Sequence, residues 1–418
     1  MKTTIKFSLG FPWGALALIA MAFALTSTAL AQYTSTTLYT FPLNNASGTA
    51  VPSGLIMDGA GNLYGTTSTG GSCGNQEFCG TVFEIARFGN VWIPGTIYSS
   101  PIGNLGSPLT MDAAGNLYGV VSTGGNRSAK YCDSGCGLVF ELSPGTGGWT
   151  YTELFAFHGV DGGNPGGALT LDSAGNLYGT TSQGGTFNWG TAYKLTPTTG
   201  GWQYKVIHFF ANGTDGKRPN SALTMDADGN LYGVADGGLN NDGVVFKLTP
   251  SGAAYHFQYI HTFTGGAKGS NPTGPLLLDA AGDLFGTTVG GGSPKTVCII
   301  SGGCGIAYEL QKTSTGYIQK TLHNFIANID GQAPQGGLVT DSSGNLYGAT
   351  AYGIDGNVKI YGTVFELTPT TSGWTESILL TGTRTFGTFT GGVILDPAGN
   401  LYGPAQTEVI FQLSPPTP

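Results

Sequence analysis

Residues 109–119 read LTMDAAGNLYG, and this stretch decides the fold. One apolar run precedes Asp112 and another follows Asn116, which is typical of two strands joined by a tight hairpin. Asp suits the first turn position because its carboxylate accepts the backbone N–H groups that follow it. Gly115 falls where a positive φ is often needed, which costs glycine little. The stretch therefore predicts a β-hairpin with a fixed turn chemistry.

The same turn occurs seven times along the chain. Each copy carries Asp at its first position and Gly three residues later. The turn aspartates are Asp58, Asp112, Asp172, Asp226, Asp279, Asp341 and Asp396. Successive copies lie 54, 60, 54, 53, 62 and 55 residues apart, which is the spacing of a repeat architecture. Each copy therefore marks one structural unit.

Each repeat contains four candidate strands. In the third repeat the inner strand covers residues 168–171, the second strand residues 177–181 and the third strand residues 191–195. An outer strand follows, marked by an aromatic residue and a bulky residue six positions later, as at Trp202 and His208. Seven units of four antiparallel strands predict an all-β fold, a seven-bladed β-propeller.

The order of the strands also predicts how the ring closes. The segment after residue 31 begins with a lone outer strand, residues 33–41, and the chain ends with a lone set of three strands, residues 393–413. We expect these two segments to pair and complete the seventh blade. No linker remains, so residues 32–418 are expected to form a single domain.

The first 31 residues have the pattern of a secretory signal peptide. Lys2 and Lys6 precede an apolar stretch, residues 14–25, and Ala-Leu-Ala at residues 29–31 forms a small-residue cleavage site. We expect cleavage after Ala31 and an exported protein, periplasmic or extracellular. No later segment is apolar enough to predict a membrane span.

Composition limits the possible partners. Charged residues make up 10% of the chain, glycine contributes 72 residues, and the net charge is −8. Low charge and abundant glycine suit a turn-rich β protein. The acidic balance argues against a nucleic-acid partner, because no basic patch is visible to neutralise phosphates. We expect a monomer without a cofactor.

The repeated second and third strands resemble a known family. Gly-Asn-Leu-Tyr-Gly-Thr-Thr at residues 61–67, followed by Gly-Thr-Val-Phe-Glu-Ile at residues 80–85, is similar to the GloVer tandem-repeat proteins, exported bacterial proteins with varied C-terminal anchors. The resemblance covers the mature chain and implies a propeller and an exported location. It implies no catalytic residues. The chain departs from the family in having no evident anchor.

Six cysteines form three pairs, each in a loop between a second and a third strand. The pairs are Cys73 and Cys79, Cys132 and Cys136, and Cys298 and Cys304. With a signal peptide and an even count, the pattern predicts one disulfide within each loop. The alternative is a metal site, although zinc sites usually combine more closely spaced pairs with histidine.

Neither the aspartates nor the histidines predict catalysis. The seven turn aspartates could form a carboxylate ring that holds a cation, but the simpler interpretation is that each carboxylate serves its own turn. His208, His261 and His323 occupy an outer-strand position that holds Tyr, Phe or Leu in other repeats, which indicates packing. No nucleophile elbow or metalloprotease motif occurs. We expect no catalytic residues and no metal.

Function is expected where the repeats differ, in the loops that share one face of the ring. The candidate ligand-binding residues there are Arg127, Tyr131, Phe187, Trp189, Tyr352 and Tyr361. Exposed aromatic rings suit stacking on a sugar or gripping a peptide. The alternative is that they only pack the loops.

These observations favour a non-catalytic module that binds a glycan or protein on the loop face, at or outside the cell envelope. The first alternative is a propeller hydrolase or lyase, lactonase-like or lyase-like, that uses the same face. The second is a purely structural envelope protein.

Overall fold

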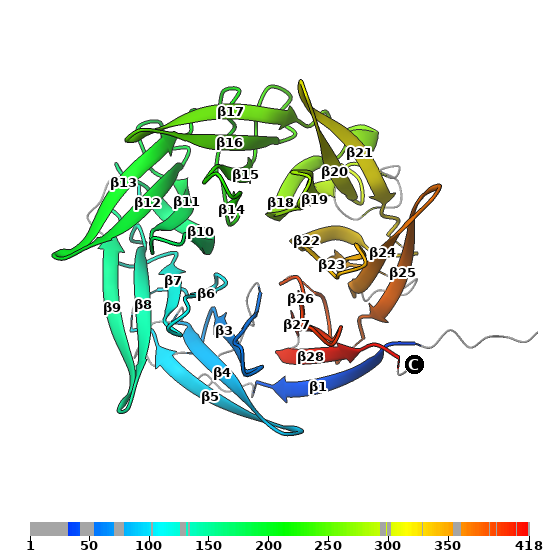
Figure 1. The fold of residues 1–418 in the computed structure, drawn as a ribbon, viewed down its shortest axis with the longest axis horizontal. Coiled ribbons are helices and arrows are strands. Elements are labelled where there is room, and N and C mark those ends of the chain that lie inside the picture. The colour runs from blue at the N-terminus through cyan, green and yellow to red at the C-terminus, as the bar shows by residue number, and fades with distance from the viewer. Residues whose placement is uncertain are drawn as a thin grey trace, which may run out of the picture.

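The computed structural model describes residues 32–41, 54–70, 79–101, 103–125, 131–132, 134–292, 298, 302–327, 329–353, 361–383, 385–389, 391–406 and 408–416. Seven four-stranded antiparallel sheets surround a central axis (Figure 1). The predicted seven-bladed β-propeller is therefore confirmed. In the part of the chain that the structure describes, no helix is long and apolar enough to cross a membrane.

Each blade runs from an inner strand at the axis to an outer strand at the rim, and we number the blades in chain order. The strands of blades 1, 2 and 3 are β2 (Ile56–Met57), β3 (Leu63–Thr67), β4 (Thr81–Phe88) and β5 (Val91–Ser99); β6 (Thr110–Met111), β7 (Leu117–Val121), β8 (Leu138–Gly145) and β9 (Gly148–Ala156); and β10 (Gly163–Leu171), β11 (Leu177–Gln183), β12 (Thr191–Thr198) and β13 (Gly201–Phe209).

Blades 4, 5 and 6 follow the same order. Their strands are β14 (Thr224–Met225), β15 (Leu231–Ala235), β16 (Val244–Ser251) and β17 (Ala254–Thr262); β18 (Ser270–Leu278), β19 (Leu284–Gly290), β20 (Ile306–Thr313) and β21 (Gly316–Asn324); and β22 (Gln332–Thr340), β23 (Leu346–Tyr352), β24 (Thr363–Thr370) and β25 (Gly373–Thr381). A short 3-10 helix, η1 (Gly266–Lys268), precedes β18.

Blade 7 is built from both ends of the described chain. It contains β26 (Ile394–Leu395), β27 (Leu401–Ala405), β28 (Val409–Ser414) and, as its outer strand, β1 (Thr34–Thr40). β1 pairs antiparallel with β28, from Thr34 opposite Ser414 to Thr40 opposite Val409. The predicted closure of the ring by the first strand is confirmed.

The repeated Leu-Tyr-Gly of the second strands follows from packing within each blade. The leucine and the tyrosine, such as Leu117 and Tyr118, are buried between neighbouring blades. The glycine must lack a side chain, because a Cβ on Gly119 would lie 2.5 Å from the ring of Phe140 on the third strand. Six blades carry Leu-Tyr-Gly and blade 5 carries Leu-Phe-Gly at residues 284–286, so each blade builds a similar core.

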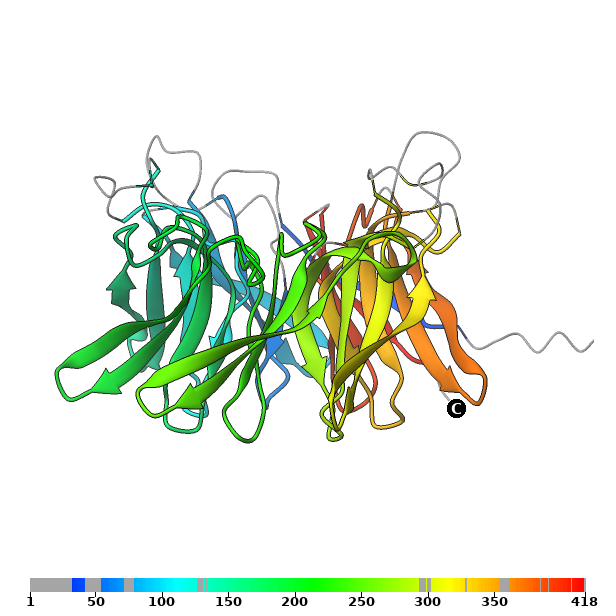
Figure 2. The same cartoon turned by 90° about the horizontal axis from the view of Figure 1, so that it is seen from above.

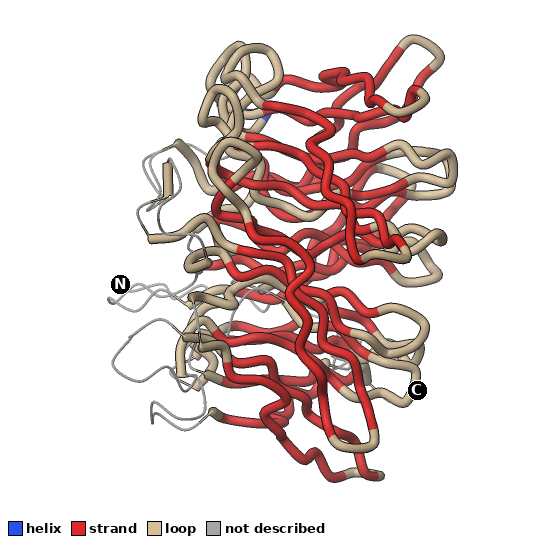
Figure 3. Tube along the Cα trace, turned by 90° about the vertical axis from the view of Figure 1, so that its left-hand side faces the viewer, coloured by secondary structure: helices blue, strands red, loops and turns tan. Residues whose placement is uncertain are grey.

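The two faces of the ring differ in their connections. The Asp turns and the hairpins between third and outer strands lie on one face (Figure 2). The loops between second and third strands, and those between an outer strand and the next inner strand, lie on the opposite face, which we call the loop face (Figures 2 and 3). The strands form the layer between the two faces.

Candidate functional site

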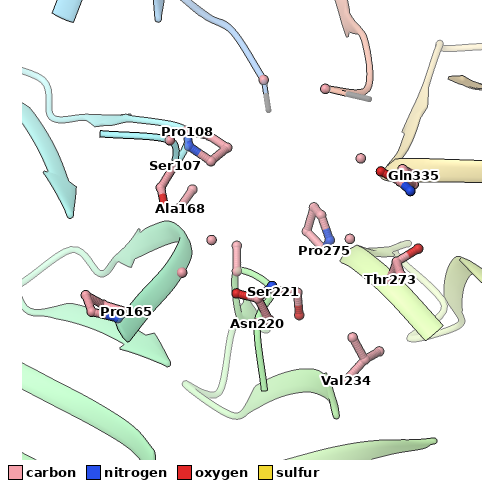
Figure 4. Close-up of a pocket in the computed structure, with 18 of the residues that line it drawn as sticks. Ser107, Pro108, Pro165, Ala168, Asn220, Ser221, Val234, Thr273, Pro275 and Gln335 are labelled. Atoms are coloured by element: carbon pink, nitrogen blue, oxygen red, sulfur yellow. The ribbon is translucent and has the colours of Figure 1, made fainter. Parts of the chain in front are cut away.

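The ring encloses an axial cavity of about 710 Å³, lined by residues of all seven blades. The residue three before each turn Asp, such as Leu169 or Leu223, is buried within the blades. Strand alternation therefore directs the residues two and four before the Asp toward the axis. Figure 4 shows Pro108, Ala168 and Asn220 around this space. The cavity lies toward the loop face, since its lining includes the segments that lead into the inner strands.

One side of the cavity, formed by blades 3 and 4, is polar. Asn164 and Ser182 line it in blade 3, and Asn220 and Asp236 in blade 4. The Asp236 carboxylate faces Arg218, with 3.6 Å between Oδ2 and Nε. Burial raises the pKa of Asp236, and the positive charge of Arg218 opposes that shift. These two side chains carry the charge in the described lining of the cavity.

Comparison of the repeats could have found this pair from the sequence. Arg218 stands eight residues before its turn Asp, where blade 3 has Asn164. Asp236 stands at the end of the second strand, where blade 3 has Ser182. A search for titratable groups confined to the inner strands misses both, because they lie just outside those strands.

On the opposite side, blades 6, 7 and 1 line the deeper part of the cavity with apolar side chains, whereas Gln335 of blade 6 lies nearer the loop face. Val339, Ile394 and Ile56 line this deeper part, each two residues before its turn Asp. Blades 2, 3 and 4 have Thr at this position, and each hydroxyl donates a hydrogen bond to a carbonyl oxygen of the next blade. The pairs are Thr110 to Leu169, Thr170 to Leu223 and Thr224 to Leu276. These hydroxyls join neighbouring blades instead of facing a ligand.

The structure does not gather the predicted aromatic residues into one site. Phe187, Tyr131 and Tyr352 are exposed to 55%, 38% and 36%, and Tyr361 is half-buried. Phe187, Tyr131 and Tyr361 lie in loops between second and third strands, and Tyr352 is the last residue of β23. They come from blades 2, 3 and 6, and none lines the cavity. Arg127 lies outside the described residues.

Trp189 is less exposed than the sequence suggested. Its ring is half-buried against the core between blades 3 and 4, which includes Phe246. The Nζ atom of Lys217 lies 5.3 Å from the ring centre, a cation–π distance. The loop of blade 3 folds against the next blade, so Trp189 contributes to the seam between the two.

The cysteine loops contain the predicted disulfides where the structure describes both partners. Cys132 is bonded to Cys136, and Cys298 to Cys304. Cys79 is also disulfide-bonded, but Cys73, its predicted partner, lies outside the described residues. Cys136 and Cys304 are fully buried, so both described bridges anchor their loops in the protein interior.

The turn aspartates form hydrogen bonds within their own turns. In blade 3, Oδ1 of Asp172 accepts the amides of Ala174 and Asn176, and Oδ2 accepts Asn176 Nδ2 and the Tyr178 hydroxyl. Gly175 has φ 81°, as the turn requires. Burial by itself would raise the pKa of Asp172, but these hydrogen bonds outweigh it and the pKa is lowered.

Of the histidines, His208, His261 and His323 pack against phenylalanine rings at the rim, and His208 and His323 also pair with carboxylates. The His208 ring stacks on Phe257 at 4.3 Å and its Nε2 lies 3.2 Å from Asp215. His323 Nε2 lies 2.7 Å from Asp330. Among the described residues, no three His, Cys, Asp or Glu side chains are close enough together to hold a metal ion.

The family assignment rests on the repeat itself. The model of the Gloeobacter/Verrucomicrobia repeat, to which the short name GloVer refers, matches residues 107–300. The match spans blades 2 to 4 and the first two strands of blade 5, and the seven-bladed ring fits it. Residues 107–300 of this chain carry the Gloeobacter/Verrucomicrobia repeat. The family resemblance predicted from residues 61–67 and 80–85 is thereby confirmed.

Solved structures share the fold of this repeat protein at low sequence identity. A candidate 6-phosphogluconolactonase from Bacteroides uniformis is 10% identical, with a TM-score of 0.50, over 79% of this chain and 85% of its own. The extracellular domain of a candidate one component system from B. thetaiotaomicron is 11% identical, with a TM-score of 0.52, over 92% of this chain and 40% of its own. No curated protein shows a significant match. These similarities concern the fold alone.

Proposed function

We propose that this chain is an exported, non-catalytic binding module that holds a small uncharged ligand in the axial cavity. The observation that carries the proposal is the cavity itself, because about 710 Å³ is within the range of small-molecule sites. Asn164, Asn220, Ser221 and Gln335 line it with hydrogen-bond donors and acceptors that carry no charge. Such a lining suits the hydroxyl groups of a glycan.

The exposed rings of the loop face would extend this site. Phe187, Tyr131 and Tyr352 stand outside the cavity with large exposed fractions. A longer glycan, or a protein that presents one, would contact them after its end enters the cavity. The ring is closed by strands of one chain, which supports a monomer as the binding unit.

Export is supported by the cysteines and by the first residues of the sequence. Disulfides such as Cys132–Cys136 persist in oxidising compartments outside the cytosol. Residues 1–31, which lie outside the described residues, have the pattern of a secretory signal peptide. We place the mature protein in the periplasm or outside the cell.

Filling the cavity tests the binding function. Ala168 lines the cavity, so Ala168→Trp would occupy the space of a ligand. The matched control is Ala113→Trp, at an exposed turn on the opposite face. Neutral oligosaccharides are titrated by calorimetry against wild type and both variants, with melting curves to verify folding. Binding to wild type and Ala113→Trp but not to Ala168→Trp supports the proposal. Equal binding to all three, or to none, contradicts it.

A second candidate function is hydrolysis in the same cavity. The raised pKa of Asp236, next to Arg218, favours it, because carboxyl groups with perturbed pKa values often act as acids or bases. Turnover of lactones and glycosides by wild type, lost in Asp236→Asn while ligand binding is retained, would establish the enzyme. Without ligand or turnover, a structural role in the envelope is the function that remains.

A further inference from the structure

The polarity of one inner-strand position changes from one group of neighbouring blades to the next. The inner-strand residue two before the turn Asp is Thr in blades 2, 3 and 4, but Leu, Val or Ile in blades 5, 6, 7 and 1. Val339, Ile394 and Ile56 of this second group line the cavity and are partly exposed to it. Three consecutive blades therefore present one apolar wall, which lies deeper than Gln335, the polar residue that blade 6 contributes nearer the loop face.

The polar wall lies across the axis from the apolar wall. In a ring of seven, blade 7 stands opposite the seam between blades 3 and 4 (Figure 1). That seam contributes Asn164, Asn220 and the pair of Arg218 with Asp236. A ligand that spans the cavity would meet hydrogen-bonding groups on one side and hydrocarbon on the other.

The two walls also lie at different depths. Asn164 and Asn220 stand eight and six residues before their turn Asp, near the loop face, whereas Ile394 stands two before its own. At about 3.3 Å per strand residue, four to six residues would span about 13 to 20 Å. The bulge between Gly166 and Thr170 shortens this path, so the apolar wall lies on the order of 10 Å deeper along the axis. A ligand would keep its polar end near the loop face and direct its apolar end inward.

The charges on the polar wall favour a neutral head group. Arg218 is the one cation in the described lining, and it already faces Asp236. A phosphate or carboxylate would need a cation without such a partner, because a charge taken out of water must be paired. Sugar hydroxyls need only the donors and acceptors that Asn164 and Asn220 provide.

We propose that the axial cavity binds an amphipathic glycoconjugate, with a neutral sugar head on the polar wall and an alkyl or aryl tail on the apolar wall. This inference rests on the proposed binding function. It narrows the ligand from glycans in general to glycans that carry an apolar aglycone.

A series of alkyl β-glucosides tests the apolar wall. Methyl, hexyl and octyl glucoside are titrated by calorimetry below their micelle-forming concentrations. Each buried methylene is expected to tighten binding about fourfold until the tail fills the wall. Octyl glucoside should therefore bind at least on the order of 100-fold more tightly than methyl glucoside. Equal affinity across the series overturns the inference.

Two variants separate the contributions of the walls. Val339→Thr combined with Ile394→Thr introduces the residue that blades 2, 3 and 4 carry at this position, so the fold accommodates it. It should remove the dependence on tail length, so that octyl glucoside binds this variant no more tightly than methyl glucoside does. Asn220→Ala should weaken every glucoside by the same factor and preserve that dependence. If the double threonine variant still binds glucosides more tightly as the tail lengthens, the inference is overturned.

The cavity-filling variant Ala168→Trp distinguishes failure of this inference from failure of the binding function. Sugar binding that Ala168→Trp abolishes, with no gain from a tail, keeps the binding function and overturns the amphipathic ligand. Tail-dependent binding that persists in Ala168→Trp places the tail outside the cavity and overturns the inference. Absence of all binding by wild type overturns both.

Discussion

The backbone amide of Arg218 donates a 2.7 Å hydrogen bond to the carbonyl oxygen of Trp189, across the seam between blades 3 and 4. Among the described residues, the same bond joins three other pairs of adjacent blades, always to the residue that precedes the glycine at the start of a third strand. These pairs are Asn164 to Cys136, Asn271 to Asp242 and Ala333 to Cys304. We call this contact the seam bond.

The donors of the seam bonds hold an unusual backbone conformation. Their φ angles lie between 49° and 54°, although none is glycine, and each precedes a proline. A left-handed conformation costs such residues roughly 1–2 kcal/mol. The seam bond offsets this cost. In two of the four seams, the carbonyl that accepts the bond belongs to a disulfide-bonded cysteine.

We predict that the Cys132–Cys136 disulfide stabilises the adjacent seam bond. Replacing both cysteines by alanine frees the loop that positions the Cys136 carbonyl. Closing so small a ring stabilises by about 2 kcal/mol in the chain-entropy model. Hydrogen exchange of the Asn164 amide, measured by mass spectrometry, is therefore expected to accelerate roughly tenfold or more.

The seam between blades 4 and 5 provides the control for this prediction. Its donor is Asn271 and its acceptor is Asp242, in a loop without cysteine. Exchange of the Asn271 amide should stay as in wild type when Cys132 and Cys136 are replaced. Equal acceleration at both seams would show general loosening of the ring and contradict a local role.

The Asp turns are predicted to differ in strength between blades 3 and 5. Asp172 accepts four hydrogen bonds, whereas Asp279 accepts the amides of Ala281 and Asp283, and blade 5 has Phe285 in place of the tyrosine. Asp172→Ala should lower the free energy of unfolding by on the order of 2–3 kcal/mol, and Asp279→Ala by about 1 kcal/mol. Urea unfolding measures both.

The pH dependence of the blade 3 turn follows from the lowered pKa of Asp172. A carboxyl group whose pKa is lower in the folded protein than in the unfolded chain stabilises the folded protein at pH values above its unfolded pKa. That contribution is lost as the pH falls through the folded pKa. The decrease in unfolding free energy caused by Asp172→Ala should therefore be greatest at pH 7 and become smaller below about pH 4. A constant loss down to pH 2 would contradict this account.

The ring could be predicted from the sequence because each of its decisive features recurs in every blade. Gly115 and its equivalents mark the turns, and the unpaired strand at residues 33–41 requires a partner at the other end of the chain. Strand pairing depends on the apolar runs and turn residues within each hairpin, and a single sequence is enough to identify them.

The candidate site was harder to predict because it depends on contacts between repeats. Trp189 resembles an exposed loop aromatic in sequence, and only the position of the next blade shows that Lys217 covers its ring. The exchange of Thr for Val339 or Ile394 looks conservative within a strand. Its effect on the cavity appears only when the blades are arranged around the axis.

We predict that Phe41 holds the ring closed. Its side chain, only 4% exposed, follows β1 and packs edge-on against Phe83 of blade 1 at 5.0 Å. Phe41→Ala should therefore cost about 3–5 kcal/mol of unfolding free energy, as deletion of a buried phenylalanine does. Hydrogen exchange in β1 should accelerate first, because β1 is the strand that the side chain anchors.

The matched control is Phe210→Ala, which removes an equally placed phenylalanine between blades 3 and 4. It should lower the free energy of unfolding by a similar amount. Hydrogen exchange should accelerate in blades 3 and 4, whereas β1 should stay protected. If Phe41→Ala leaves exchange in β1 unchanged, the closure does not depend on this side chain.

Glu376 provides the last prediction. It lies on β25, and its Oε1 atom is buried without a hydrogen-bond partner among the described residues. Burial raises its pKa to about 7; the negative charge of Asp330 adds to the shift and His323 opposes it. The equivalent residue of blade 5 is Gln319, so the amide fits this position of the fold.

The folded protein thus holds a proton on Glu376 that the unfolded chain releases at lower pH. The stability contributed by the protonated form is full below the unfolded pKa of about 4.3 and is lost as the pH rises through about 7. Glu376→Gln is therefore expected to melt at the same temperature as wild type at pH 4 and at a higher temperature at pH 8. Glu153→Gln, at an exposed position of β9, should melt like wild type at both values. Equal melting of Glu376→Gln and wild type at pH 8 would show that the carboxylate is solvated there, with its Oε1 atom in contact with water.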